Sequence, residues 1–496
     1  MSYLDILKLA APETIVVLAA LAVLAVDLTV MRGTETRLRF VIGGMVAGVG
    51  CVAAAAWLVV VPTHGGVWGG MMVVNELTQL IKVGLLALTL FTVLISLEAD
   101  FTAHVGEFLA LILLATVGMM FLVSAENVLM VFVALELTSL SLYILTAFNK
   151  RNVRSAEAAL KYFLFGGMAA AFMLFGLSLL YGLSGSTNLR EIAAALASNG
   201  LDPLLVVAIV MTVIGFGFKV AAVPFHLWAP DAYEGAPTPS AAFIASGSKV
   251  ASFFIFAQVM MIGFAGAEGS GAWRNYASGW VPAIAMVAAL SMVLGNLVAI
   301  VQSNVKRLLA YSAIAHAGYA LLGILANSEF GMASLIYYVI TYGLTTLGAF
   351  GVVAAVEQGT GDAKLSDFAG LSRRAPFLSF CMFIFMLSLA GIPPLAGFFG
   401  KFYVFAAVVK DGAVHLGLLW LVILAIAMSA VSLYYYLQVL KRIYVADLPT
   451  GAEALRVPMT AQVALGMLAA GVVLLGCFPG LLVERLTALV LLVGQP

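Results

Sequence analysis

Charged residues are scarce in this sequence. Of its 496 residues, 10% are Asp, Glu, Lys or Arg and 63% are hydrophobic, whereas roughly 25% of an ordinary soluble domain is charged. A soluble fold of this length would need far more polar surface, so lipid must be the solvent for most of the chain. The formal net charge is zero, so no basic excess points to nucleic acid as a partner.

Cysteine is also rare, and the sequence motifs of redox proteins are missing. The three cysteines, Cys51, Cys381 and Cys477, lie far apart without a Cys-x-x-Cys pair, which argues against an iron–sulfur cluster or a structural zinc site. No Gly-x-Gly-x-x-Gly fingerprint of a dinucleotide site is present, and no spaced histidine pair could hold a haem. These absences disfavour a catalytic electron-transfer subunit.

Long apolar runs recur from one end of the chain to the other. A membrane-spanning helix needs about 20 mostly apolar residues, and the runs between polar breaks predict about fourteen such helices. The predicted spans are 12–31, 40–61, 77–97, 106–124, 127–148, 158–183, 203–227, 238–265, 280–302, 308–327, 331–356, 377–409, 415–440 and 460–482. The predicted fold class is an all-α polytopic membrane protein whose longest polar connections, 184–202 and 357–376, are loops.

The basic residues between the spans concentrate in alternate loops. One set of loops carries 14 of them: Arg32, Arg37, Arg39, Lys150, Arg151, Arg154, Lys306, Arg307, Lys364, Arg373, Arg374, Lys441, Arg442 and Arg456. The other set, together with both termini, carries five: Lys8, Arg190, Arg274, Lys410 and Arg485. Because positive loops stay in the cytoplasm, both termini are predicted to lie outside.

The five remaining basic residues fall inside predicted helices: Lys82, Lys161, Lys219, Lys249 and Lys401. On insertion scales a charge at the bilayer centre costs about 2.5–3.5 kcal/mol, so such residues usually face the protein interior and serve a function. Lys82 lies near a membrane face, and we expect its long side chain to reach the interface.

Prolines interrupt the seventh and the twelfth predicted spans, in each case beside a lysine. Lys219 precedes the first break and Lys401 follows the second. Proline frees a backbone carbonyl, which lipid tolerates only where protein or water satisfies it, and broken helices beside a charge mark ion pathways in transporters. A kink used only for packing is the alternative. The predicted helix-break residues are Pro224, Pro230, Pro393 and Pro394.

The two broken spans lie five helices apart and therefore run in opposite directions, as an inverted repeat of helices 4–8 upon helices 9–13 would produce. The predicted organisation is 1–105 for helices 1–3, 106–265 for the first five-helix repeat, 280–440 for the second repeat, and 460–496 for helix 14 and the end of the chain.

Several polar residues inside the spans are candidates for proton transfer. Glu136 is a carboxylate near the middle of the fifth span; without a partner it would be neutral, so Lys219 is its natural partner. Lys249 lies mid-helix in the eighth span between serines, and we predict a function in ion transfer for it.

Two further candidates keep two interpretations each. Glu157 and Lys161 lie four residues apart on one helix face, and they form either a local ion pair near the cytoplasmic end or part of a proton relay. His316 is either a hydrogen-bonded packing residue or a relay residue.

Three stretches make the chain recognisable. Residues 224–239 read Pro-Phe-His-Leu-Trp-Ala-Pro-Asp-Ala-Tyr-Glu-Gly-Ala-Pro-Thr-Pro, residues 307–319 read Arg-Leu-Leu-Ala-Tyr-Ser-Ala-Ile-Ala-His-Ala-Gly-Tyr, and residues 391–401 read Gly-Ile-Pro-Pro-Leu-Ala-Gly-Phe-Phe-Gly-Lys. In these stretches the chain resembles the subunit N (subunit 2) family of bacterial NADH-quinone oxidoreductase, or complex I. That family consists of antiporter-like membrane subunits, and the resemblance runs through nearly the whole chain.

The resemblance implies a role for each of four positions. Glu136 matches the family's channel glutamate, Lys219 its paired lysine, Lys249 its central relay lysine and Lys401 its exit-side lysine. The implied function is proton translocation across a bacterial cell (inner) membrane by a multi-pass subunit with no cofactor of its own. FMN, iron–sulfur clusters and quinone would belong to partner subunits. The expected partners are the other membrane-arm subunits of a hetero-oligomer and membrane lipid, not nucleic acid. A subunit of a cation/proton antiporter or of a membrane-bound hydrogenase is the alternative.

Overall fold

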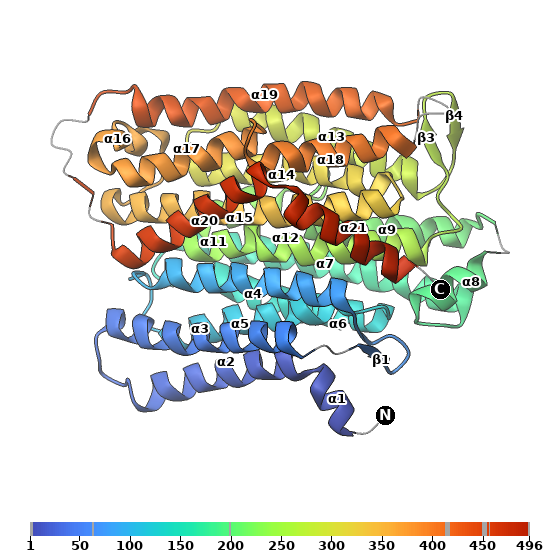
Figure 1. Cartoon of the computed structure of the whole chain (residues 1–496), viewed down its shortest axis with the longest axis horizontal. Helices are drawn as coiled ribbons and strands as arrows, with labels where there is room; N and C mark the ends of the chain where they lie inside the picture. The colour runs from blue at the N-terminus through green and yellow to red at the C-terminus, as the bar shows by residue number, and fades with distance from the viewer. Residues whose placement is uncertain are drawn as a thin grey trace. The chain divides into compact units, whose positions relative to one another are not determined.

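The computed structural model of the chain describes residues 3–61, 64–197, 200–411, 417–448, 454–455 and 457–494. These residues form two compact units. Unit 1 comprises Met1–Lys219, Gly235–Glu268 and Leu492–Pro496, and unit 2 comprises Val220–Glu234 and Gly269–Leu491. Figure 1 shows the elements of both units, coloured along the chain.

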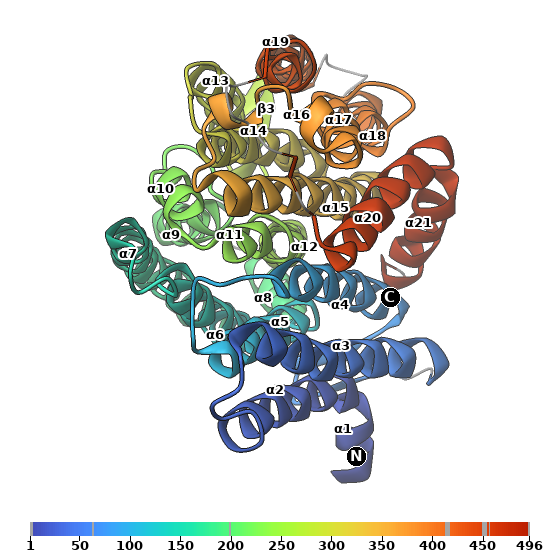
Figure 2. The ribbon, with the colours of Figure 1, turned by 90° about the vertical axis from the view of Figure 1, so that its left-hand side faces the viewer.

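Unit 1 is a bundle of long helices with one small hairpin. Its elements are α1 (Tyr3–Leu9), α2 (Ala11–Thr29), α3 (Thr36–Val60), β1 (Gly65–Val67), β2 (Met72–Val74), α4 (Glu76–Ser96), α5 (Val105–Val123), α6 (Val128–Thr146), α7 (Val153–Ser184), α8 (Leu189–Leu196), α9 (Pro203–Lys219), α11 (Thr238–Ala245), α12 (Gly247–Gln258) and the π-helix η1 (Val259–Gly263). Helices α2, α3, α4 and α5 lie side by side, as Figure 2 shows, and α12 contacts α4, α5 and α9.

Unit 2 also consists of long helices and one small hairpin. Its elements are α10 (Trp228–Gly235), β3 (Ser270–Ala272), β4 (Asn275–Ala277), α13 (Trp280–Ile300), α14 (Val305–Leu325), α15 (Glu329–Thr360), the 3₁₀ helix η2 (Leu365–Phe368), α16 (Leu371–Arg374), α17 (Pro376–Ala390), α18 (Ala396–Asp411), α19 (Leu419–Tyr444), α20 (Met459–Cys477) and α21 (Gly480–Gly494). Helix α15 contacts α14, α17, α18 and α20 and is buried along almost its whole length.

The predicted fold class is confirmed. Within the described ranges, twelve helical segments are long and apolar enough to cross a membrane, and α9 and α17 are shorter apolar helices. These two belong to the predicted seventh and twelfth spans, and both end where the sequence predicted a break: α9 at Lys219 and α17 at Ala390. All fourteen predicted spans therefore have a counterpart.

The structure departs from the predicted elements in several places. The last predicted span, 460–482, is wrong at its end, because α20 stops at Cys477 and α21 starts at Gly480. Pro479 lies between them, and proline cannot continue a helix. Both polar stretches predicted to be loops contain short helices: 184–202 contains α8, and 357–376 contains η2 and α16. The predicted span 238–265 is interrupted at Ser246, between α11 and α12.

The same backbone junction occurs once in each unit. In unit 1 the Val128 N–H donates to the Thr187 carbonyl at 2.8 Å, which joins the start of α6 to the segment after α7. In unit 2 the Val305 N–H donates to the Ala363 carbonyl at 2.8 Å, which joins the start of α14 to the segment after α15. Helices α7 and α15 each have 32 residues and end at a left-handed glycine, a common helix terminator. These matches are what two related five-helix repeats would produce.

Candidate functional site

Lys219, the last residue of α9, lies against one face of α6. Its Nζ donates a hydrogen bond to Ser139 Oγ and lies 5.8 Å from the centre of the Tyr143 ring. The Ser139 hydroxyl in turn donates to the Leu135 carbonyl one turn back along α6. Ser139 and Tyr143 are four residues apart, so they share a helix face, and Lys219 lies beside it.

Glu136 lies on the same helix as Ser139, three residues earlier, and is partly buried. It is close enough to Lys219 for the two charges to interact, but its buried Oε1 has no hydrogen-bond partner among the described residues. The lysine thus bonds the serine, while a carboxylate oxygen close by stays unpaired. Leaving a buried polar atom unpaired costs free energy, so this arrangement has an unfilled position that a proton or a moved lysine could fill.

Lys249 lies on α12 in the interior of unit 1, with its side chain 1% exposed. The helix is irregular on both sides of it. The helix is interrupted at Ser246, between α11 and α12, and the π-helix η1 follows α12. The hydroxyls of Ser246 and Ser248 both donate to carbonyls four residues back, at 2.7 and 2.6 Å. Short π-helices are frequent at functional sites, so η1 is compatible with the predicted role of Lys249.

Glu157 and Lys161 form an ion pair of 2.8 Å along α7. Their side chains are 59% and 41% exposed respectively, unlike the buried Lys249. Helix α7 shows many exposed apolar side chains on the same stretch. This placement on the surface of unit 1 favours the local ion pair over the relay.

We therefore predict that the double variant Glu157→Gln/Lys161→Gln assembles normally and keeps its transport activity within about twofold. Exposed ion pairs contribute about 0–1 kcal/mol, so little stability is lost. Complex assembly on native gels and proton transport in vesicles are the measurements. A severalfold loss of transport at normal assembly would assign the pair to the relay.

Lys401 lies on α18, directly after the second break. Its Nζ donates to the carbonyls of Leu389 and Ala390 at 3.0 and 3.1 Å and to Ser429 Oγ at 2.8 Å. The two carbonyls are at the C-terminus of α17, where the last carbonyls of a helix have no intrahelical partner. One buried lysine therefore satisfies the carbonyls that the break exposes. The break itself contains Pro393 and Pro394.

A surface cavity opens beside Lys401 in unit 2. It has a volume of about 360 Å³ and lies among α17, α18 and α19. Lys401 and Ser429 are its polar lining, and apolar side chains such as Phe398, Phe402 and Phe405 form most of the rest.

His316 on α14 is buried and engaged at both ring nitrogens. Nδ1 lies 2.7 Å from the Tyr338 hydroxyl and Nε2 3.1 Å from the Tyr436 hydroxyl. The Tyr436 hydroxyl continues to Ser312 Oγ at 2.5 Å. The histidine also lies close enough to Lys401 for the two to interact electrostatically. His316 is thus part of a hydrogen-bonded chain, which serves either of its two predicted roles.

A second polar group in unit 2 was missed by the sequence analysis. Asn296 donates to the Tyr319 hydroxyl and accepts from the Tyr435 hydroxyl, both at 2.9 Å. Lys401 Nζ lies 5.0 Å from the centre of the Tyr319 ring. The signal in the sequence was an asparagine within an apolar span, since a buried amide in lipid needs partners.

Two of the recognised stretches meet in an ion-pair cluster that was also missed. Arg307 donates to Asp231 Oδ1 at 2.7 Å and to Glu234 Oε2 at 2.9 Å. This cluster fixes α10 to the start of α14 in unit 2. Pro230 lies in the first turn of α10, where proline is tolerated, whereas Pro224 lies in the break between α9 and α10.

The expectation for Lys82 was wrong. Its side chain is 0% exposed and forms an ion pair of 2.6 Å with Glu13 of α2, itself 2% exposed. Among the described residues, neither the ammonium nor the carboxylate has a hydrogen-bond partner outside this ion pair. Lys82 therefore does not reach the interface. Glu13 and Lys82 occupy the first two turns of α2 and α4, the helix ends predicted to lie outward. Their similar depth in the membrane could have predicted from the sequence that they pair.

In the described part of the chain no group of three or more His, Cys, Asp and Glu side chains could hold a metal ion. The arrangement is one of single lysines at discontinuous helices, joined to hydroxyls, carbonyls and a histidine. Fold and site together define a polytopic membrane protein of the antiporter-like type.

Comparison with known proteins agrees with this class. Residues 125–429 match the family model described as NADH:quinone oxidoreductase/Mrp antiporter, TM. A relative from Acidobacterium capsulatum, NADH-quinone oxidoreductase subunit N 2, is 53% identical over 98% of this chain and 99% of its own length. The chain belongs to the subunit N family of NADH-quinone oxidoreductase, as the sequence resemblance predicted.

Solved structures carry the same fold. A chain of respiratory complex I from Thermus thermophilus with bound aureothin aligns with a TM-score of 0.79 at 33% identity, covering 96% of this chain and 99% of that one. A chain of the Mrp complex from a Dietzia species aligns with a TM-score of 0.81 over 98% of this chain and 97% of its own, at 20% identity. The second match shows the fold alone.

Proposed function

We propose that the chain is a proton-translocating membrane-arm subunit of an NADH-quinone oxidoreductase. Partner subunits would oxidise NADH through FMN and iron–sulfur centres and reduce quinone, and this chain would carry protons across the bacterial membrane without a redox centre of its own. One observation carries the proposal: Lys219 and Lys401 each lie at a break in a membrane span and are held by neutral acceptors.

In the first step of the proposed path, Glu136, Ser139 and Lys219 load the proton. Ser139 binds the lysine, while Glu136 Oε1 has no hydrogen-bond partner in the part of the chain that the structure describes. When the lysine ammonium moves to the carboxylate, the ion pair stabilises the bound proton. When it returns to the neutral serine, the charged form loses that stabilisation, because burial disfavours an unpaired ammonium. A change in this separation would therefore load or release one proton.

In the last step, Lys401 releases the proton. An ammonium has three donors, and all three are used by Leu389, Ala390 and Ser429. Losing one proton leaves one acceptor unsatisfied, so release requires a shift at the break or a water in its place. The cavity beside Lys401 supplies space for that water.

Between these steps we infer that Lys249 and then His316 carry the proton. Lys249 follows Lys219 in the chain order, and His316 already has Tyr338, Tyr436 and Ser312 in a hydrogen-bonded chain. Repeats 106–265 and 280–440 would then supply one broken span each.

Proteoliposomes that contain the complete complex test the function. NADH and a quinone should produce a proton gradient that a protonophore abolishes. A cation gradient imposed without NADH should produce none. Proton movement driven by the cation gradient and independent of NADH would replace the proposal with the antiporter.

We also predict that both termini face outward, because 14 loop Lys and Arg residues lie on one side and five on the other. Cysteines introduced at Ser2 and Gln495, which lie outside the described residues, should react with an impermeant thiol reagent in spheroplasts. Cys477 is exposed, so all three native cysteines should first be replaced by serine. Labelling that requires lysis would reverse the topology.

A further inference from the structure

A pocket in unit 1 lies on the side that loop charge assigns to the cytoplasm. It has a volume of about 300 Å³ and is formed by the start of α3, the segment before α5 and the segment between α6 and α7. The residues lining it are Thr36, Asp100, Phe101, Thr102, Ala103, His104, Phe148, Lys150 and Arg151. None of them belongs to the proposed proton path.

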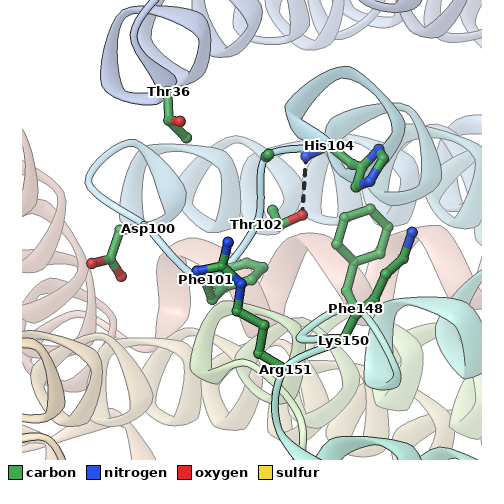
Figure 3. Close-up of a pocket in the computed structure, with 9 residues that line it drawn as sticks. Thr36, Asp100, Phe101, Thr102, His104, Phe148, Lys150 and Arg151 are labelled. Carbon is green, nitrogen blue, oxygen red and sulfur yellow. Dashed lines mark hydrogen bonds between the residues drawn. The ribbon is translucent and has the colours of Figure 1, made fainter.

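Two cations project into this pocket from the same segment. Figure 3 shows the Lys150 and Arg151 side chains on either side of the Phe148 ring. Within the described ranges neither of them forms an ion pair of 4 Å or less. Asp100 is the one acidic residue of the lining, and its carboxylate points away from both cations in Figure 3. The pocket therefore has a surplus of positive charge.

Three other basic side chains near this pocket have carboxylate partners. Arg39 binds Asp27 at 2.7 Å, Arg37 binds Glu98 at 3.0 Å, and His104 Nδ1 lies 3.2 Å from Glu107 Oε1. Lys150 and Arg151 differ from these three side chains, and an anion from outside the chain would give them a partner.

The start of α3 adds a second attraction for an anion. Helix α3 begins at Thr36, in the pocket wall, and no side chain of the described residues caps it. The first backbone N–H groups of a helix lack intrahelical partners and carry a partial positive charge, so helix N-termini attract phosphate. Here an uncapped N-terminus lies in the same pocket as the two cations.

We propose that this pocket binds the phosphate of an anionic phospholipid headgroup at the cytoplasmic surface of the membrane. Lys150, Arg151 and the start of α3 would hold the phosphate, and the rings of Phe101 and Phe148 would contact the glycerol and the first acyl carbons. Basic pockets between helices on this side are suited to anionic lipids. The volume is at the lower end of the ligand-pocket range of roughly 300–1,000 Å³, which suits a headgroup.

Photocrosslinking in the complete complex tests this site. The complex is placed in phosphatidylcholine nanodiscs and titrated with a photoreactive phosphatidylglycerol, and crosslinks to residues 100–104 and 148–151 are quantified. Lys150→Gln/Arg151→Gln should raise the half-saturating lipid concentration about 30-fold, which corresponds to roughly 1 kcal/mol for each basic residue. The control Lys441→Gln/Arg442→Gln removes two exposed basic residues that are consecutive in the sequence and lie outside the pocket. It should leave the half-saturating lipid concentration unchanged.

Each outcome decides the proposal. Saturable crosslinking that the pocket variant loses and the control keeps supports it. Equal crosslinking in all three proteins, or in the same peptides with a photoreactive phosphatidylcholine, overturns it. Displacement by inorganic phosphate at the same concentration as the lipid would identify a free phosphate site and overturn the lipid assignment. The result is independent of proton transport, because the measurement needs no NADH.

Discussion

Replacing Lys219 by arginine is expected to abolish proton pumping, although the variant keeps the positive charge. Arginine stays protonated, with a pKa above ~12, so it can pair with Glu136 or bond Ser139 but cannot release a proton. Lys219→Ala should also abolish pumping. The measurement is NADH-driven acidification in proteoliposomes, normalised to the amount of assembled complex and to NADH–quinone electron transfer.

Assembly must be measured beside pumping, since removing one partner of a buried pair can cost about 3–5 kcal/mol. Lys410→Arg, at the exposed end of α18, is the matched control and should pump normally. If Lys219 only neutralises Glu136 or caps the end of α9, arginine should rescue most of the function. Normal pumping by an assembled Lys219→Arg complex would therefore refute a carrier role.

The fold was predictable because lipid imposes a simple rule on the sequence. Each span must be apolar over about 20 residues and satisfy its own backbone, so composition alone marks the fourteen spans. The breaks were predictable for the same reason, since proline removes a backbone donor wherever it stands. Irregularities without proline, such as the one at Ser246, leave no such mark.

The partners of the polar side chains were less predictable, because they depend on which helices meet. The sequence predicted that Lys219 pairs with Glu136. Its hydrogen bond to Ser139 depends on which face of α6 is turned toward Lys219, and one sequence does not show that. Lys401 was expected at the second break, yet nothing in one sequence says that it would bond the carbonyls of Leu389 and Ala390. Tertiary contacts decide such pairings.

Breaking the Glu13–Lys82 pair is expected to give the largest loss of stability in the chain. Glu13→Gln and Lys82→Met each leave one charged group in a site where both side chains are at most 2% exposed. Removing one partner of a buried ion pair costs about 3–5 kcal/mol. The double variant Glu13→Gln/Lys82→Met removes both charges, so it should lose much less than the sum of the two single variants. Chemical unfolding of the purified chain in detergent measures all three.

The exposed pair Arg37–Glu98 provides the matched control. Its two charged groups lie 3.0 Å apart, against 2.6 Å in the buried pair, and Arg37 is 71% exposed. Arg37→Gln and Glu98→Gln should therefore each cost at most about 1 kcal/mol. The contrast tests burial, because both pairs join separate segments of unit 1, and Arg37 is exposed whereas Glu13 and Lys82 are not. Single variants of Glu13 and Lys82 as mild as those of the control would show that the buried pair is not charged. A double variant as unstable as the sum would show that the two side chains act independently.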